Sequence, residues 1–401
     1  MATTPIYMDN HSTTRVDPRV VEAMLPYFTE QFGNPGSTSH SFGWQAKEAV
    51  DQARAEIATA IGAVEREIVF TSGATESNNL ALRGVAGRRR RKGNHIISVA
   101  TEHKAILDPL DRLAREDFEI TYLPVAQNGS GNAGEIDLNQ LADAIRDDTL
   151  LVTIMLANNE TGVLQPIREI SRLCRERDVL LHSDATQAVG RIPVDVEQLG
   201  VDLMSFSAHK MYGPKGSGAL YVRRSVRQVR LVSQIDGGGQ QRGMRSGTLN
   251  VPGIVGLAKC LSLCVEEMQS EAPRLAASRD SLWKQLSERL EQIQLNGPAL
   301  SDPTKRLSGN LNVSFGDVDG EALMMSMGGL AVSSGSACTS ANPEPSHILR
   351  AMGLTDDQTR SSLRFGLGRF NTQEEVDRAV ELVVEAVNRL RGLSGAAQAV
   401  R

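Results

Sequence analysis

Three short polar segments of the sequence each follow an apolar run that is typical of a β-strand. Lys210 lies in the segment 205–214, where its amine could form a Schiff base with an aldehyde. Asp184 follows the run 179–181, and a carboxylate at a strand end can keep a pyridinium nitrogen protonated. Residues 71–78 are small and polar and begin a helical pattern, so their N–H groups could bind an anion. Any one of these features is also typical of a helix N-cap or a solvated side chain, but together they indicate a site for pyridoxal 5′-phosphate (PLP).

Three further side chains could take part in chemistry at such a site. Cys338 lies among small and polar residues, whereas the other three cysteines lie in apolar helical patterns, so Cys338 is the candidate nucleophile. Arg364 lies in an apolar strand pattern and needs a partner there, either a structural ion pair or a substrate carboxylate. His103 follows another predicted strand and could stack on a flat cofactor and move protons. The histidines outside these segments are expected to be structural or solvated: His11, His40, His95, His182 and His347.

The elements that would position these residues alternate between strands and helices over residues 43–260. Short apolar runs, typical of strands buried on both faces, predict strands over 68–70, 96–99, 120–123, 150–156, 179–181 and 203–206. Helical spacing of apolar residues between these runs predicts covering helices, the first over 44–61. The alternation favours an α/β fold with a mainly parallel sheet between helices.

The final third of the chain has a different pattern, which predicts a smaller α+β domain. Its apolar spacing predicts a helix over 282–293 and a strand over 311–315, and Thr372 with Glu375 forms a capping box before a last helix. We therefore expect three parts: an N-terminal arm over 1–15 that packs with the small domain, a large PLP-binding domain over 16–262, and a small domain over 263–401 that carries Cys338.

Composition and charge exclude several other classes of protein. With 40% hydrophobic and 23% charged residues in 401, the chain is typical of a globular protein. Its net charge of −5 argues against general nucleic-acid binding, and no apolar run is long enough to span a membrane. The four cysteines form no ligand set with histidines, so no metal site is expected. The first residues lack a signal-peptide pattern, which favours the cytoplasm.

In the order in which they occur, these motifs resemble those of the group I, NifS/IscS-like cysteine desulfurases of the class V aminotransferase superfamily. The resemblance lies in residues 72–77, 101–104, 184–187, 207–210 and 333–340 and extends over nearly the whole chain. It implies a fold-type I PLP enzyme that works as a homodimer. It also implies conversion of L-cysteine to L-alanine, with the sulfur taken up as a persulfide and passed to an acceptor or scaffold protein for iron–sulfur cluster or other sulfur biosynthesis.

The same resemblance implies a role for each residue around the cofactor. Lys210 would hold PLP covalently, and Asp184 would pair with its ring nitrogen. His103 would stack on the ring and act in catalysis, and Gln187 would hydrogen-bond the phenolic oxygen. The phosphate would be held by Ala74, Thr75, Ser207, His209 and, from the other subunit, Thr248.

On the substrate side, the resemblance implies that Asn159 lies near both cofactor and substrate, that Arg364 binds the cysteine carboxylate, and that Cys338 takes the sulfur.

Two alternatives to a cysteine desulfurase are another PLP enzyme of the superfamily, such as an aminotransferase or a selenocysteine lyase, and a catalytically silent member that binds a partner. An aminotransferase needs no exposed thiol, and a silent member would lack Lys210, Asp184 or Cys338. Housekeeping desulfurases carry a longer C-terminal tail that helps to dock the iron–sulfur scaffold, which leaves the identity of the acceptor open.

Overall fold

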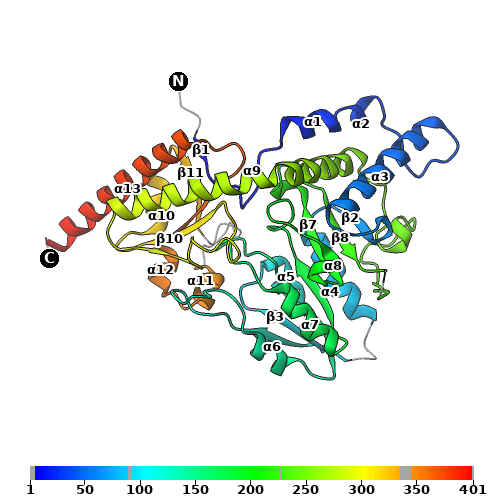
Figure 1. Ribbon diagram of the computed structural model, residues 1–401, viewed down its shortest axis with the longest axis horizontal. Helices are drawn as coiled ribbons and strands as arrows, with labels where there is room; N and C mark the ends of the chain where they lie inside the picture. The colour runs from blue at the N-terminus through cyan, green and yellow to red at the C-terminus, as the bar shows by residue number, and fades with distance from the viewer. Residues whose placement is uncertain (1–4, 89–92, 226, 335–344, 400–401) are drawn as a thin grey trace.

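The large domain is built on one seven-stranded sheet (Figure 1). The computed structural model describes residues 5–88, 93–225, 227–334 and 345–399, with side chains through 393; Cys338 lies outside the described residues. The strands of the sheet, in spatial order, are β2 (Ile68–Thr71), β8 (Gly218–Val222), β7 (Leu203–Ser207), β6 (Leu180–Asp184), β5 (Thr149–Thr153), β3 (His95–Val99) and β4 (Glu119–Leu123). Only β8 runs antiparallel to its neighbours, so the prediction of a mainly parallel α/β sheet is confirmed.

Most strands are buried on both faces because helices cover both sides of the sheet. On one side, α4 (Ala74–Arg88) and α5 (Lys104–Ala114) pack on alternate strand residues such as Val69 and Leu220. On the other side, α3 (Ser41–Ala60), α7 (Ile167–Glu176) and α9 (Val251–Arg289) pack on the intervening residues, such as Phe70 and Met204. The exception is β4, whose side chains are partly exposed at the edge of the sheet.

Short helices complete the large domain. They are α1 (Pro18–Met24), α2 (Pro26–Thr29), α6 (Leu138–Ala144), α8 (Val196–Leu199) and the 3₁₀ turns η1 (Glu65–Glu67), η2 (Ala208–Lys210) and η3 (Gln241–Gly243). None of the described helices is long and apolar enough to cross a membrane. In the part of the chain that the structure describes, no group of His, Cys, Asp and Glu side chains is arranged to hold a metal ion.

The small domain is an antiparallel sheet covered by helices. The strand order is β12 (Ser333–Ser334), β13 (Ser362–Gly366), β10 (Asn310–Phe315) and β9 (Ile293–Leu295). The helices are α10 (Gly320–Ser326), α12 (Asp356–Arg360) and α13 (Gln373–Ala399), whereas α11 (His347–Ala351) packs its Ile348 and Leu349 in the core of the large domain. The capping box forms as predicted, because the N–H of Thr372 donates to Glu375 and the N–H of Glu375 donates to Thr372 Oγ1. The helix expected over 282–293 is wrong at its end, since Gln292 has a φ of 52° and Ile293 begins β9.

Two segments join the domains. The 39-residue helix α9 runs from the large sheet to the small domain, where it lies beside α13 (Figure 1). The position expected for the domain boundary, 262–263, lies inside this helix, which packs in the large core up to Cys264 and in the small core from Leu275. At the N-terminus, β1 (Ile6–Tyr7) pairs in parallel with β11 (Leu330–Ala331). The chain then crosses from the small domain to the loop that follows β7.

Candidate active site

Ten of the predicted site residues line one pocket between the large sheet and β13. They are Ala74, Thr75, His103, Asn159, Asp184, Gln187, Ser207, His209, Lys210 and Arg364. The carboxyl ends of β3, β6 and β7 meet here, which is where open α/β sheets bind their ligands. Thr248 does not line this pocket; it is exposed, a short distance before α9. Among the described residues, the pocket therefore brings together every predicted site residue except Thr248.

Lys210 ends the turn η2, directly after β7, and reaches the N-terminal arm. Its Nζ donates to the carbonyl oxygens of His11 and Ser12, each at 2.6 Å. The guanidinium of Arg191 donates to the carbonyl of Lys210 at 3.0 Å and to that of Asn10 at 2.8 Å. The amine is thus directed into the pocket by backbone carbonyls of the arm, while Arg191 ties the arm to the lysine's own backbone.

Asp184 is the last residue of β6, and its carboxylate is held by two donors. Asn78 Nδ2 donates to Oδ2 at 2.7 Å, and the N–H of Thr186 donates to Oδ1 at 3.0 Å. Burial, and then the charge of Asp184, raise the pKa of the nearby Glu102 well above its usual value. Burial lowers the pKa of His182, whose ring bonds two hydroxyl groups. Two donors therefore hold the Asp184 carboxylate in place at the strand end, where it lines the pocket as a partner for a pyridinium nitrogen has to do.

His103 is the N-cap of α5, and its ring is neutral in this setting. Nδ1 accepts a hydrogen bond from the N–H of Ala105 at 3.0 Å, which places the proton of the neutral ring on Nε2. Burial lowers the pKa of His103. A neutral, oriented imidazole on the pocket wall is suited to stack on an aromatic ring.

Small residues and hydroxyl groups line the end of the pocket near α4. Gly73, just before the helix, has a φ of 152°, and a Cβ on Gly218 would come within 2.6 Å of Gly73 Cα. The loop therefore approaches the sheet as closely as glycines allow. Glu76, the acidic residue in the first turn, pairs with Arg245 at 2.7 Å. The N-terminal N–H groups of α4 and the Thr75 hydroxyl remain as donors that suit a phosphate, and Ser207, whose hydroxyl donates to the carbonyl of Ser217 at 3.3 Å, lines the same pocket.

Arg364 lies on β13 with its guanidinium almost fully buried. Nη2 donates to Asp9 Oδ1 at 2.9 Å and to the hydroxyls of Ser12 and Ser333, and Nη1 donates to the carbonyl of Asn159 at 2.8 Å. The structural ion pair considered from the sequence is therefore present, with Asp9. The guanidinium also lines the pocket, so a bound carboxylate could reach it.

The residues on both sides of 335–344 contact the pocket wall. Ser333 bonds Arg364, and Ser346 Oγ donates to the buried carboxyl of Glu160 at 2.5 Å. Glu160 follows the pocket residue Asn159, and burial raises the pKa of Glu160 to about 7.

The three described cysteines, Cys174, Cys260 and Cys264, are buried as expected, and burial raises the pKa of each thiol. Their burial makes all three poor nucleophiles.

Sequence reasoning missed His11 and Ser12, which also line the pocket. His11 was expected to be structural or solvated, but its buried ring donates from Nδ1 to Gln187 Oε1 at 3.1 Å, and its carbonyl accepts from Gln187 Nε2 at 2.8 Å. Burial lowers the pKa of His11 well below its usual value. In the sequence, the polar residues 9–14 directly follow the apolar residues 6–8, which is the same pattern as at the other strand ends, but no local pattern connects this segment with Lys210.

The residues of the pocket fit PLP by their chemistry. A lysine amine, a carboxyl group, a neutral imidazole and a helix N-terminus with hydroxyl groups are present together. Four polar atoms of pocket residues are also buried without a hydrogen-bond partner in the described part of the chain: His11 Nε2, Asn159 Oδ1, Thr186 Oγ1 and Arg364 Nε. Buried polar atoms are rarely left unpaired, so their concentration here is typical of a binding site.

Fold and pocket together define a PLP-dependent enzyme of fold type I. Residues 6–379 match the family model "Aminotransferase class-V". A cysteine desulfurase IscS from Anaeromyxobacter sp. (strain Fw109-5) is 57% identical over 390 residues, which cover 97% of this chain and 94% of the relative. A solved structure titled "NIFS-LIKE PROTEIN" has a TM-score of 0.87 and 36% identity, covering 96% of this chain and all of that one. Another, "SspA in complex with cysteine", has a TM-score of 0.79 and 37% identity, covering 91% and 99% of the two chains.

The chain belongs to the class-V aminotransferase family and, within it, to the NifS/IscS-like cysteine desulfurases. The resemblance on which the sequence analysis relied is thereby confirmed. The cofactor of this family is PLP, in agreement with the chemistry of the pocket.

Proposed function

We infer that this chain is a PLP-dependent cysteine desulfurase, which converts L-cysteine to L-alanine and transfers the sulfur to an acceptor. The observation that carries this conclusion is one pocket that joins Lys210 and Asp184 at the large sheet with Arg364 on the small one. The relatives named cysteine desulfurase, and the neighbour solved with cysteine, favour this activity over that of an aminotransferase or a selenocysteine lyase. The presence of Lys210, Asp184 and Cys338 argues against a silent member.

When bound, PLP supplies an electron sink that allows the Cα–H bond of the amino acid to break and the C–S bond to weaken. We propose that Lys210 Nζ holds the cofactor and later moves the Cα proton. Asp184 would keep the ring nitrogen protonated, and His103 would stack on the ring. Gln187 Nε2 uses one N–H on His11, which leaves the second for the phenolic oxygen. The phosphate would be bound by N–H groups at Ala74 and Thr75 and by the side chains of Ser207 and His209.

On the substrate side, Arg364 would bind the carboxylate, and Asn159 would lie beside it with its unpartnered Oδ1. We propose that the thiolate of Cys338 attacks the substrate sulfur. An S–S bond forms as the C–S bond breaks, its electrons stay on the carbon skeleton, and alanine leaves after that skeleton has taken up protons. The persulfide on Cys338 is then passed to an acceptor protein, for iron–sulfur clusters or other sulfur-containing products.

The Cys338→Ser variant tests the assignment of the sulfur carrier. It is expected to bind PLP and L-cysteine, because neither step uses the thiol, but its release of alanine should fall to the level seen without enzyme, because a hydroxyl is a poor nucleophile toward sulfur. In the wild type, the persulfide formed in one turnover can be trapped with an alkylating reagent. Peptide mass spectrometry of the trapped enzyme should then locate the added sulfur on Cys338.

The matched control is Cys174→Ala, which removes a buried thiol at a stability cost of about 1 kcal/mol and should keep both alanine release and the persulfide. A persulfide on another cysteine, or full activity of Cys338→Ser, contradicts the assignment. Release of a 2-oxo acid in place of alanine would instead point to an aminotransferase.

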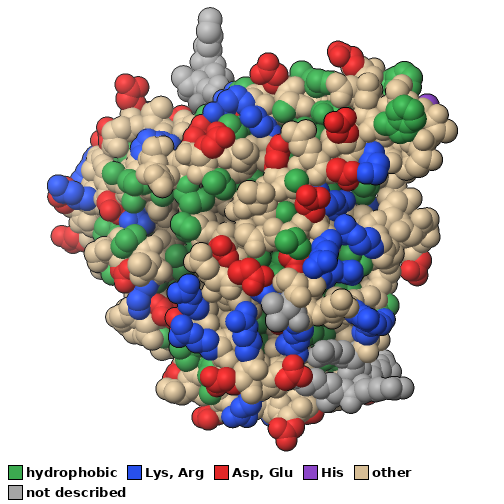
Figure 2. All heavy atoms as spheres, turned by 45° about the vertical axis from the view of Figure 1, so that its right-hand side comes forward, with side chains coloured by type: hydrophobic (Ala, Val, Ile, Leu, Met, Phe, Trp, Pro, Cys, Tyr) green, Lys and Arg blue, Asp and Glu red, His purple; other side chains and the backbone are tan. Residues whose placement is uncertain are grey.

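We also propose that the enzyme is a homodimer in the cytoplasm. Figure 2 shows charges of both signs spread over the surface, with hydrophobic side chains exposed among them. Large apolar side chains are exposed along one stretch of the sequence, at Val21, Leu25, Phe28, Phe32, Phe42 and Trp44. A dimer would cover such side chains and would let exposed Thr248 reach the phosphate of the other subunit. Light scattering of the holoenzyme should give twice the mass of one chain; a stable monomer with full PLP content would contradict this.

A further inference from the structure

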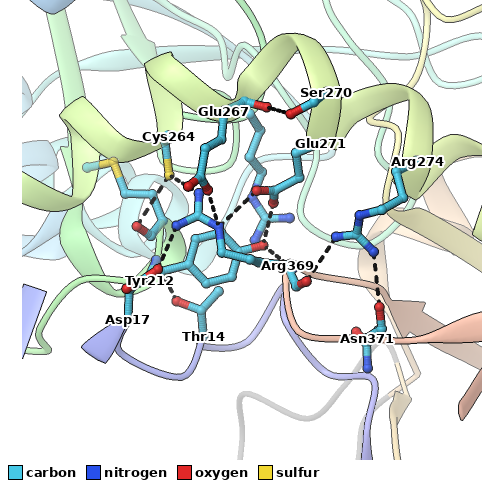
Figure 3. Close-up of polar contacts among 12 residues, drawn as sticks. Thr14, Asp17, Tyr212, Cys264, Glu267, Ser270, Glu271, Arg274, Arg369 and Asn371 are labelled. Carbon is cyan, nitrogen blue, oxygen red and sulfur yellow. Dashed lines mark hydrogen bonds and ion pairs between the residues drawn. The ribbon is translucent and has the colours of Figure 1, made fainter. Parts of the chain in front are cut away.

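Arg369 lies at the centre of a set of polar contacts that joins three distant parts of the chain (Figure 3). Its guanidinium pairs with Asp17 at 2.9 Å, with Glu271 at 2.9 Å and with Glu267 at 3.1 Å. Asp17 precedes α1, both glutamates lie on α9, and Arg369 follows β13. We call these four residues and Tyr212 the Arg369 cluster.

The Arg369 cluster is largely shielded from water. The side chains of Arg369, Asp17 and Glu271 are 9%, 2% and 15% exposed, whereas that of Glu267 is 33% exposed, so the shielded part of the cluster is Arg369 with Asp17 and Glu271. Hydrogen bonds from Arg19, and then from Arg369, hold the pKa of Asp17 well below its usual range. Buried pairs of this kind hold their geometry more firmly than surface pairs do, because loss of one partner leaves a charge without water.

Tyr212 connects the Arg369 cluster to the segment that carries Lys210. Its hydroxyl donates to Glu271 Oε1 at 3.0 Å and accepts from the N–H of Arg369 at 2.7 Å. Its ring lies 4.4 Å from the guanidinium of Arg369. Its backbone is also held, since its N–H donates to Thr14 and its carbonyl accepts from the N–H of Asp17. A change at the Tyr212 hydroxyl is therefore transmitted to the backbone just after Lys210.

The other side of the Arg369 cluster connects to the strand that carries Arg364. The carbonyl of Arg369 accepts from Arg274 of α9 at 2.9 Å, and the carbonyl of Asn371 accepts from the same side chain at 3.0 Å (Figure 3). The segment that leaves β13 is thus fastened to α9 by both Arg369 and Arg274. Lys210 follows a strand of the large sheet and Arg364 lies on a strand of the small one, and Tyr212 bonds both α9, which joins the two sheets, and the segment that leaves β13.

We propose that Tyr212 is a positioning residue that sets the separation between Arg364 and the cofactor held at Lys210, so that one amino acid can bind the cofactor through its amine and Arg364 through its carboxylate. The two groups of an α-amino acid are a fixed distance apart, so a shift between the cofactor and Arg364 weakens simultaneous binding. The proposal rests on the proposed function, in which Arg364 binds the carboxylate.

The test uses holoenzyme with Tyr212→Phe, which keeps the ring contact with Arg369 and removes only the hydroxyl. Two amines are titrated and followed by the absorption of the cofactor: L-alanine, which has a carboxylate, and ethylamine, which has none. Binding of L-alanine is expected to weaken by up to roughly tenfold, because the effect on binding cannot exceed the free energy of the lost buried hydrogen bond to a charged group, and binding of ethylamine should not change. KM for L-cysteine should rise by a similar factor, with a much smaller change in kcat.

A second variant, Glu271→Gln, keeps an acceptor for the Tyr212 hydroxyl but removes the charge that faces Arg369; it should shift L-alanine binding in the same direction. The control is Arg289→Gln, which removes an exposed ion pair with Glu381 farther along α9 and should change neither ligand's binding. Equal weakening of both ligands by Tyr212→Phe, or weakening of neither, overturns the proposal.

The Arg364→Ala variant distinguishes failure of the proposed carboxylate site from failure of the positioning role of Tyr212. If this variant binds L-alanine as tightly as the wild type, Arg364 is not the carboxylate ligand and that part of the proposed function fails. If it weakens L-alanine binding while Tyr212→Phe does not, only the positioning role fails. In the Arg364→Ala background, Tyr212→Phe should have no further effect on L-alanine binding, because the group that it positions is gone.

Discussion

Replacing Lys210 with alanine is expected to lower turnover of L-cysteine by at least about a thousandfold. Nζ lies 2.6 Å from each of two backbone carbonyl oxygens of the N-terminal arm, and an alanine at this position has no amine to attach the cofactor or to move a proton. Borohydride reduction of the wild-type holoenzyme, followed by peptide mass spectrometry, should find the cofactor on Lys210, and the Lys210→Ala variant should show no reduced adduct.

The pocket provides its own control for this experiment. Lys215 also lines it but is exposed to solvent and has no role in the proposed chemistry. Lys215→Ala should therefore keep both the reduced adduct and most of the turnover. A reduced adduct on Lys215, or on any lysine other than Lys210, would show that the lysine has been misassigned.

The second large effect is expected for Asp184→Asn, which should bind PLP but lose turnover by roughly a hundredfold or more. The amide is the same size as the carboxylate and can still accept from Thr186, but a neutral group does not keep the ring nitrogen protonated. Turnover per bound cofactor is the quantity to measure, because it separates chemistry from occupancy.

A matched substitution is available at Asp202, another buried aspartate, which lies just before β7 and outside the pocket. Its Oδ2 accepts from the N–H of Leu181 at 3.0 Å, so Asp202→Asn should cost stability and leave turnover per cofactor unchanged. If Asp184→Asn also turns over near the wild-type rate, Asp184 has only a structural role.

The part of the site that could be predicted from the sequence is the part in which each residue follows its own strand. Asp184 and Ser207 end β6 and β7, Lys210 follows within a turn, and His103 begins the helix after β3. An apolar run followed by a polar residue is a local signal. The rule that ligands bind at the carboxyl ends of parallel strands then brings these residues together without knowledge of any long-range contact.

The residues that were missed depend on pairing between distant segments. His11 reaches the pocket because β1 pairs with β11 and the next residues bridge to β13, contacts that no local pattern encodes. Strand β8 was missed for a similar reason, since it is the antiparallel member of an otherwise parallel sheet. The helix end near Ile293 was misplaced because apolar spacing alone does not indicate that Gln292 has a positive φ.

The ion pair between Arg364 and Asp9 affects which anions of the cell can bind in the pocket. An incoming carboxylate finds a guanidinium whose charge is already balanced and whose Nη2 is already occupied by Asp9, Ser12 and Ser333. Under the proposed role of Arg364, binding would be an exchange of one carboxylate for another, or a gain of the unpartnered Nε–H and the second N–H of Nη1, and not the capture of an anion by an unpaired cation. Chloride, phosphate and simple organic acids gain little from such a site. An amino acid, anchored by its amine as well, has the additional binding energy that the exchange requires.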